Sequence, residues 1–267
     1  MLGKLIKHEF IALSRYFLPL YLFAIALTPV FSLLFRLGLS DNAIPLTAIM
    51  SAFGITGFVF SMIALFVASS LLIVIRFYRT TATSEAYLTF TIPAKPGQIL
   101  LSKLIVSSVW QLVSFMMGVI TIMGMLLITG LFTPADMASG ISELIKYLFI
   151  DSDASVPITL SLYALSGIIG IPAGILLFYC SIMLGQLFNE HRVIASIGMY
   201  MAITTAVQIL NMVITLPIAT LGSSGNNMVI ISSMNITIAL ATGLNVIVGA
   251  ACYVVTAFIM KKKLNVR

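Results

Sequence analysis

The stretch RFYRTTATSEAYLTFTIPAKPG, residues 76–97, is a polar segment that separates two long apolar runs. It is the one long segment between predicted helices that carries several basic residues. Thr83 or Ser84 can cap the start of a short helix, and Glu85 is favourable in its first turn. Pro93 then ends that helix. The pattern predicts a short helix held between two long ones.

Composition places the chain in a membrane. Apolar residues make up 60% of its 267 residues and charged residues 8%, whereas charged residues are roughly a quarter of a soluble domain. A bilayer span takes about 20 apolar residues, so there is room for roughly six. We expect an all-α membrane protein with a single domain over 1–267: an amphipathic helix at 1–16 and spans near 17–37, 47–75, 99–131, 157–187, 193–217 and 235–260.

Two surface helices are expected besides the spans. In residues 1–16, apolar side chains recur at helical spacing opposite a basic face, which predicts a helix lying in the membrane interface. Between the third and fourth spans, Ile141, Leu144, Ile145 and Leu148 recur at i, i+3, i+4 and i+7. That spacing predicts a short helix on the outer surface.

The net charge of +6 is distributed unevenly. Basic residues lie at both termini and in alternate loops, and only Arg36 and Lys146 lie on the other side. The positive-inside rule therefore puts both termini, the segment 76–97 and the turn 188–192 in the cytoplasm. Contact with the membrane explains this charge without a nucleic-acid partner.

Catalytic sites can be tested by elimination. His8 and His191 are the only histidines, and neither has a carboxylate or cysteine at a metal-ligand spacing. The chain has no HExxH, no GxSxG and no phosphate-binding loop. Cys180 and Cys252 lie inside predicted spans and are interpreted as small apolar packing residues. We expect no enzyme activity and no cofactor or metal in this chain.

Ion-coupled transport is the main competing function. Such carriers commonly place ionisable residues near the bilayer midplane, and no predicted span has one in its middle. Lys103 lies in the first turns of the third span, where it can snorkel to the headgroups. A sodium-coupled carrier that uses backbone carbonyls stays open. In the fourth span, Gly170 and Gly174 form a GxxxG pair that would let another helix approach closely.

The order of these features resembles that of a bacterial ABC-2 type permease, the membrane subunit of an ABC exporter. The resemblance covers nearly the whole chain, from the amphipathic start through six spans. Its most specific part is the run from Tyr87-Leu88 to Ile92-Pro93 followed by QILLSK at 98–103. This run is similar to a pattern of Gram-positive members.

The resemblance implies roles for two cytoplasmic segments. Residues 1–16 would be an elbow helix on the inner leaflet, and the short helix between spans two and three would be a coupling helix seated in a cleft of an ATPase subunit. Its candidate contact residues are Ser84, Glu85, Tyr87, Leu88 and Phe90. A smaller second contact would be formed by Asn189, Glu190, His191 and Arg192.

The function implied is ATP-driven export across a bacterial cell membrane. A permease pair, of identical or different chains, would work with a separate ABC ATPase that holds ATP and Mg. Because no charged residue is expected on the path, the cargo would be apolar or amphipathic, such as an antimicrobial peptide or a lipid. The alternatives are an ion-coupled carrier and a membrane anchor or sensor subunit that moves no cargo.

Overall fold

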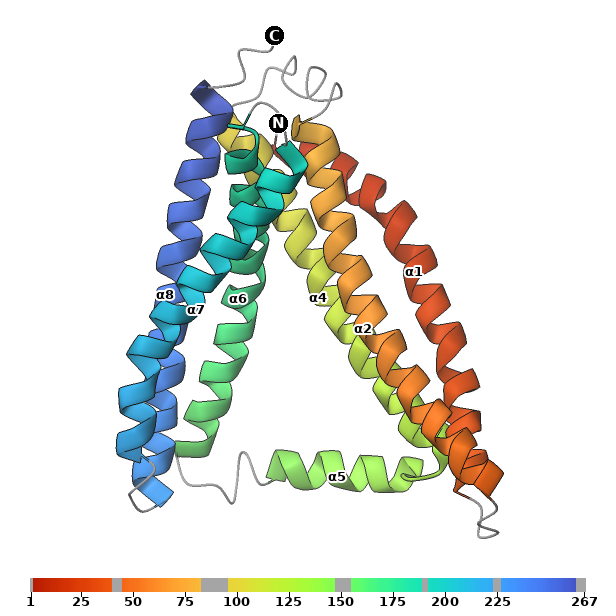
Figure 1. The fold of residues 1–267 in the computed structure, drawn as a ribbon. Coiled ribbons are helices and arrows are strands. Elements are labelled where there is room, and N and C mark those ends of the chain that lie inside the picture. The colour runs from red at the N-terminus through yellow and green to blue at the C-terminus, as the bar shows by residue number, and fades with distance from the viewer. Residues whose placement is uncertain are drawn as a thin grey trace. The chain divides into compact units, whose positions relative to one another are not determined.

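The computed structural model describes residues 2–39, 45–82, 96–146, 155–188, 192–222 and 227–262, and these form helices without any strand (Figure 1). The all-α prediction is confirmed for this part of the chain. In chain order the helices are α1 (Leu2–Gly38), α2 (Pro45–Ala82), α4 (Pro96–Thr129), α5 (Pro134–Lys146), α6 (Ser155–Gly185), α7 (Arg192–Gly222) and α8 (Asn227–Lys262).

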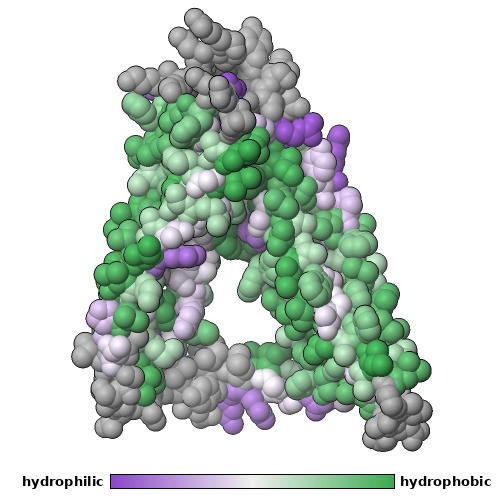
Figure 2. All heavy atoms as spheres, viewed as in Figure 1, coloured by the Kyte–Doolittle hydropathy of each residue, from purple (hydrophilic) through white to green (hydrophobic). Residues whose placement is uncertain are grey.

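Six of these helices are long and apolar enough to cross a membrane, as the sequence predicted, which indicates a multi-pass membrane protein. Apolar residues cover most of the face seen in Figure 2, and hydrophilic residues gather along α5. At about 1.5 Å per residue, the 38 residues of α2 span roughly 57 Å. The hydrocarbon core is about 30 Å thick, so α2 either tilts or extends beyond it.

Helix α1 is continuous from Leu2 to Gly38, with Pro19 and Pro29 inside it. The amphipathic start and the first span therefore belong to one helix, and the predicted boundary between residues 16 and 17 is not a break in it. Placement of the first 16 residues on the inner leaflet stays a prediction. At the other end of the chain, residues 227–234 are part of α8, so the last helix begins earlier than expected.

The residues group by their contacts into two compact units. The first unit holds Met1–Ile6, Val74–Ser108 and Tyr147–Arg267, and the second holds Lys7–Ile73 and Val109–Lys146. Helices α2 and α4 each contribute residues to both units. The prediction of one domain over the whole chain stays a prediction.

In the second unit, α1 and α2 approach each other at glycine. A Cβ added at Gly54 would clash with the backbone of Phe31 and Phe35, so no larger residue fits there without a shift of the helices. Aromatic side chains join α1 to α4: the Phe17 ring stacks on Trp110 with centroids 5.0 Å apart. The hydroxyl of Tyr21 donates to the Trp110 carbonyl at 3.1 Å.

The link from α4 to α5 uses two standard helix-end devices. Gly130 follows the last residue of α4 with φ +76°, a conformation that ends helices and favours glycine. Before α5, Thr133 and Asp136 form a capping box. The Thr133 amide donates to Asp136 Oδ2 at 2.9 Å, and the Asp136 amide donates to Thr133 Oγ1 at 3.2 Å. The short outer helix predicted from Ile141 and its neighbours is confirmed as a helix, and it begins at Pro134.

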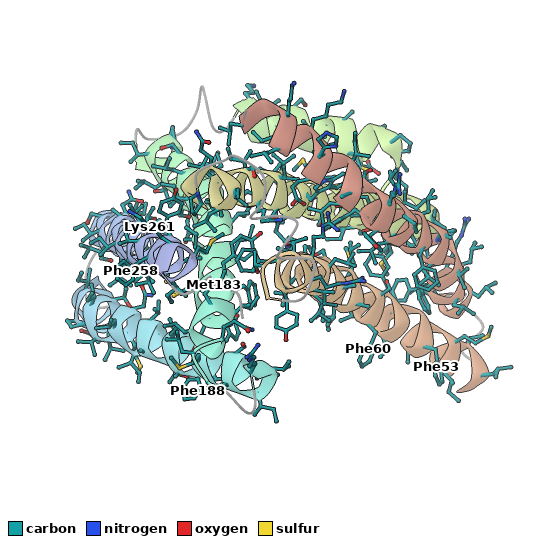
Figure 3. The ribbon with its side chains drawn as sticks, turned by 90° about the horizontal axis from the view of Figure 1, so that it is seen from above. Phe53, Phe60, Met183, Phe188, Phe258 and Lys261 are labelled. Atoms are coloured by element: carbon teal, nitrogen blue, oxygen red, sulfur yellow. The ribbon has the colours of Figure 1, made fainter. Side chains whose placement is uncertain are left out.

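In the first unit, α6 contacts both α7 and α8. Gly185 at the end of α6 lies against Ser196 of α7, and a Cβ there would reach the Ser196 backbone at 2.6 Å. A Cβ at Gly249 of α8 would lie 3.4 Å from the Ala173 side chain of α6. Figure 3, a view from above, shows α8 with Phe258 and Lys261 next to α6 with Met183.

The close helix contact predicted at Gly170 and Gly174 of α6 is not found at these glycines. No atom of the described residues comes within 4 Å of a Cβ built at Gly170 or Gly174. The helices that do approach α6 closely meet it at Gly185 and near Ala173. The GxxxG interpretation is therefore wrong for contacts among the described helices of this chain.

Candidate functional site

Most of the site residues predicted from the sequence lie outside the described residues. This holds for all five coupling-helix candidates, Ser84, Glu85, Tyr87, Leu88 and Phe90, and for Asn189, Glu190 and His191. Arg192 is described: it is the first residue of α7 and is exposed. Its carbonyl accepts a hydrogen bond from Ser196 Oγ at 2.8 Å, which ties it to the first turn of that helix.

The structure describes the two helix ends that flank the segment 83–95. Helix α2 leads into the segment at Ala82, and α4 leaves it at Pro96. Buried side chains join these ends to α6. We call Phe77, Thr80, Lys103, Ser107 and Tyr179 the Tyr179 cluster; all five belong to the first unit.

Tyr179 of α6 makes two of the contacts in this cluster. Its ring stacks on Phe77 of α2, with centroids 3.8 Å apart and an interplanar angle of 11°. Its hydroxyl shares a hydrogen bond of 2.8 Å with Ser107 of α4. Tyr179 and Phe77 are both fully buried. One side chain of α6 therefore contacts both helices that flank the segment 83–95.

Lys103 of α4 joins the same two helix ends directly. Its Nζ donates a hydrogen bond of 2.9 Å to Thr80 Oγ1 of α2, and the residue is only 5% exposed. Thr80 Oγ1 in turn donates to the Arg76 carbonyl at 2.8 Å, so its lone pairs face the ammonium. The ammonium of Lys103 is buried against the end of α2, so the structure gives it a protein partner. Its expected position at the level of the headgroups stays a prediction.

The burial of Lys103 has a physical cause and a structural consequence. A buried ammonium is costly unless polar atoms surround it, and the end of α2 presents the Thr80 hydroxyl at that place. The hydrogen bond therefore links the last turn of α2 to the first turns of α4. A hydrogen bond to a charged group is worth about 1.5–3 kcal/mol.

Helix α6 also contacts α7 and α8. The ring of Phe178, next to Tyr179 in the chain, stacks on Tyr200 of α7 with centroids 4.7 Å apart. The start of α4 also touches α8, where the Tyr253 hydroxyl donates to the Gly97 carbonyl at 3.4 Å. Movement of the α2 and α4 ends would therefore act on α6, α7 and α8.

The Tyr179 cluster suits mechanical coupling. It combines a cation, three hydroxyls and two stacked rings, each held by a neighbour, and none of its described contacts resembles a nucleophile with its base. The sequence pointed to the adjoining segment but missed the cluster, because Phe77 and Tyr179 lie 102 residues apart in the printed chain. The one available signal was Lys103, a cation inside an otherwise apolar helix.

Comparison with family models, with curated proteins and with solved structures found no match for this chain.

Proposed function

We propose that this chain is the permease subunit of an ATP-driven ABC exporter in a bacterial cell membrane. The six long apolar helices supply a membrane domain. The segment 83–95 would be the coupling element that a separate ATPase moves. Both termini and this segment would face the cytoplasm, and the cargo would be apolar or amphipathic.

The observation that carries the proposal is the attachment of this segment. A coupling element must transmit a conformational change of the ATPase to several membrane spans, as a hinge or rigid-body movement. Here the flanking helix ends are joined to each other through Lys103 and Thr80, and to α6 through Tyr179. A loop that only connects two helices would not require buried contacts at both of the helix ends that flank it.

The first experiment asks what energises transport. The chain is purified in mild detergent from its native host, and co-purifying ATPase is identified by its ATP hydrolysis. We expect an associated ATPase, and transport that stops when ATP is depleted while a cation gradient is kept. If no ATPase is present and transport follows the gradient, the chain is an ion-coupled carrier.

The second experiment tests the coupling segment itself. Glu85→Arg or Leu88→Asp should abolish ATPase association and transport, because both changes alter the predicted contact face. Glu143→Arg is the matched control: Glu143 is exposed on α5, which follows the opposite end of α4. Normal association and transport in both segment variants would contradict the assignment. Association without any cargo movement in the wild type would indicate an anchor or sensor subunit.

The carrier alternative has one observation in its favour. Lys103 is a buried cation inside an apolar helix, and such residues often mark ion pathways in membrane proteins. Its hydrogen bond joins it to the end of α2, near the boundary of the helix and not near its middle. The exporter hypothesis remains the better explanation of Lys103. In it, Lys103 has a structural role, because it joins the two helix ends that flank the coupling segment.

A further inference from the structure

Helix α5, residues Pro134–Lys146, has an apolar side and a polar side. Met137, Ile141 and Ile145 recur at i, i+4 and i+8, so they share one side of the helix. The opposite side carries the polar residues Asp136, Ser139, Glu143 and Lys146. Figure 2 shows hydrophilic residues along α5 on the side turned away from α4. This division is typical of a helix that lies on an apolar surface.

The described residues leave much of the apolar side of α5 uncovered. Ile141 is 58% exposed and Ile145 is 51% exposed, and no described side chain of α5 is buried. A helix of 13 residues is marginal in water by itself, because most helical stability in proteins comes from contact along an apolar face. We therefore expect a surface outside the described residues to cover Ile141 and Ile145.

The chain enters α5 from a helix that is long and apolar enough to cross a membrane. No charged residue lies between Lys103 and Asp136, so the apolar run of α4 continues up to the start of α5. Leu131 and Phe132, which lie between the two helices, are both exposed. The linker of residues 130–133 lets α5 start at most about 18 Å from the end of α4. Helix α5 therefore begins at the surface of the membrane in which α4 lies.

We propose that α5 is an interfacial helix that binds the lipid surface beside the end of α4. Met137, Ile141 and Ile145 contact the boundary between headgroups and acyl chains, and Glu143 faces water. The 13 residues of α5 measure roughly 20 Å along the helix axis, which is too short to cross a hydrocarbon core of about 30 Å. A helix that lies flat in the interface gives both of its sides a suitable environment.

The charge of α5 predicts which lipids it binds. The carboxylates of Asp136 and Glu143 outnumber the ammonium of Lys146, so the polar side has a net negative charge. Interfacial helices with a basic polar side are attracted to anionic headgroups, whereas α5 gains nothing from them. Its binding rests on apolar contact, and zwitterionic phosphatidylcholine should be sufficient.

The test measures the surroundings of nitroxide labels on α5 in the full-length chain, reconstituted in phosphatidylcholine vesicles. The native cysteines are first replaced by Cys180→Ala and Cys252→Ala. Each label is then attached to one introduced cysteine: Ile141→Cys, Ile145→Cys, Ser139→Cys or Glu143→Cys. All four positions are exposed, so the labels displace no packed side chain. Ile63→Cys, at an exposed position in the middle of α2, is the reference for contact with lipid.

Collisions with two reagents distinguish lipid from water, because oxygen concentrates in the bilayer and a charge-neutral nickel(II) chelate stays in water. We expect Ile141→Cys and Ile145→Cys to have a several-fold higher ratio of oxygen to nickel collisions than Ser139→Cys and Glu143→Cys. The ratio at Ile141→Cys should approach that of Ile63→Cys. It should not rise further when anionic phosphatidylglycerol is added to the vesicles.

Two results would overturn the proposal. Mainly nickel collisions on both sides of α5 would show that the helix projects into water. Few collisions with either reagent at Ile141 and Ile145 would show that protein covers them, whether another segment or a second copy of the chain. Neither result depends on whether an ATPase drives the chain.

Discussion

The ring of Tyr179 on α6 lies flat on the ring of Phe77 on α2, with 3.8 Å between their centroids. The hydroxyl of the same tyrosine shares a hydrogen bond with the hydroxyl of Ser107 on α4. One buried side chain thus contacts the last turns of α2 and the N-terminal third of α4 at once. These are the two helices that lead into and out of the predicted coupling segment.

The two interactions of the Tyr179 side chain, its ring stacking and its hydrogen bond, can be separated by substitution. Tyr179→Phe keeps the stacked ring and loses the hydrogen bond to Ser107, so we expect a loss of about 0.6–1 kcal/mol in stability from that bond. Tyr179→Ala also removes the ring and should cost about 3–5 kcal/mol. Thermal unfolding of the detergent-solubilised chain measures both. An equal loss in the two variants would show that the ring stacking contributes nothing.

Lys103 and Thr80 should behave as a coupled pair. Lys103→Met keeps the apolar stem and removes the ammonium, whereas Thr80→Val removes one acceptor, the Thr80 hydroxyl, and keeps the buried cation. We expect Thr80→Val to destabilise the chain in the presence of Lys103 and to have a smaller effect in the Lys103→Met background. A double-mutant cycle of unfolding free energies provides the measurement. Strict additivity would mean that the hydrogen bond makes no net contribution.

The glycines of α6 differ in their tolerance of a side chain. Gly185→Ala puts a methyl group against the Ser196 backbone, and overpacking of this kind costs about 1–3 kcal/mol. Gly170→Ala and Gly174→Ala are matched controls, because nothing among the described residues lies within 4 Å of their Cβ positions. These controls should be neutral or up to about 1 kcal/mol stabilising, because alanine favours helix. Similar melting temperatures for all three variants would contradict the α6–α7 contact.

The capping box of α5 should give this helix a pH dependence. Hydrogen bonds from the Thr133 hydroxyl and amide stabilise the carboxylate and lower the pKa of Asp136 below 3.8. Because the folded pKa is depressed, the contribution is present above the ordinary pKa and is lost as pH falls through the folded pKa. Protection of the first-turn amides of α5 from hydrogen exchange should therefore be constant above the ordinary Asp pKa of about 3.9 and drop as pH falls below it.

Asp136→Asn supplies the control for that measurement. The amide side chain keeps an oxygen acceptor for Thr133 but carries no charge, so protection should no longer change over the same pH range. Thr133→Val removes the hydroxyl from the box and should weaken protection at every pH. If Asp136→Asn shows the wild-type pH dependence, another group is responsible for it.

Several features of the fold could be predicted from the sequence because they depend on local composition. Long apolar runs specify the six spanning helices, since an apolar chain in a bilayer must satisfy its own backbone. The i, i+3, i+4 spacing of Ile141, Leu144 and Ile145 indicated the helix α5. The capping box at Thr133 and Asp136 was equally local and could have been found from its spacing, with Pro134 at the first helical position.

Contacts between helices could not be predicted in the same way. In an apolar span nearly every face is apolar, so periodicity does not say which side meets a neighbour. Gly170 and Gly174 have the expected spacing, yet the close approaches of α6 are made near Gly185 and Ala173. Likewise, the sequence suggested that Lys103 can snorkel to the headgroups, and only the tertiary structure shows its ammonium buried against Thr80.

The sequence by itself determined the class of protein: an all-helical fold over the described residues, with six helices long and apolar enough to span a membrane, and a polar segment at 76–97. Hydropathy and helix-end residues are properties of short stretches, so they can be read along the chain. Tertiary structure alone decided that Phe77, Lys103 and Tyr179 come together, and that Cys180 and Cys252 belong to one buried cluster. Those contacts depend on how distant helices pack, and packing is set by shape across the whole interface and not by any one segment.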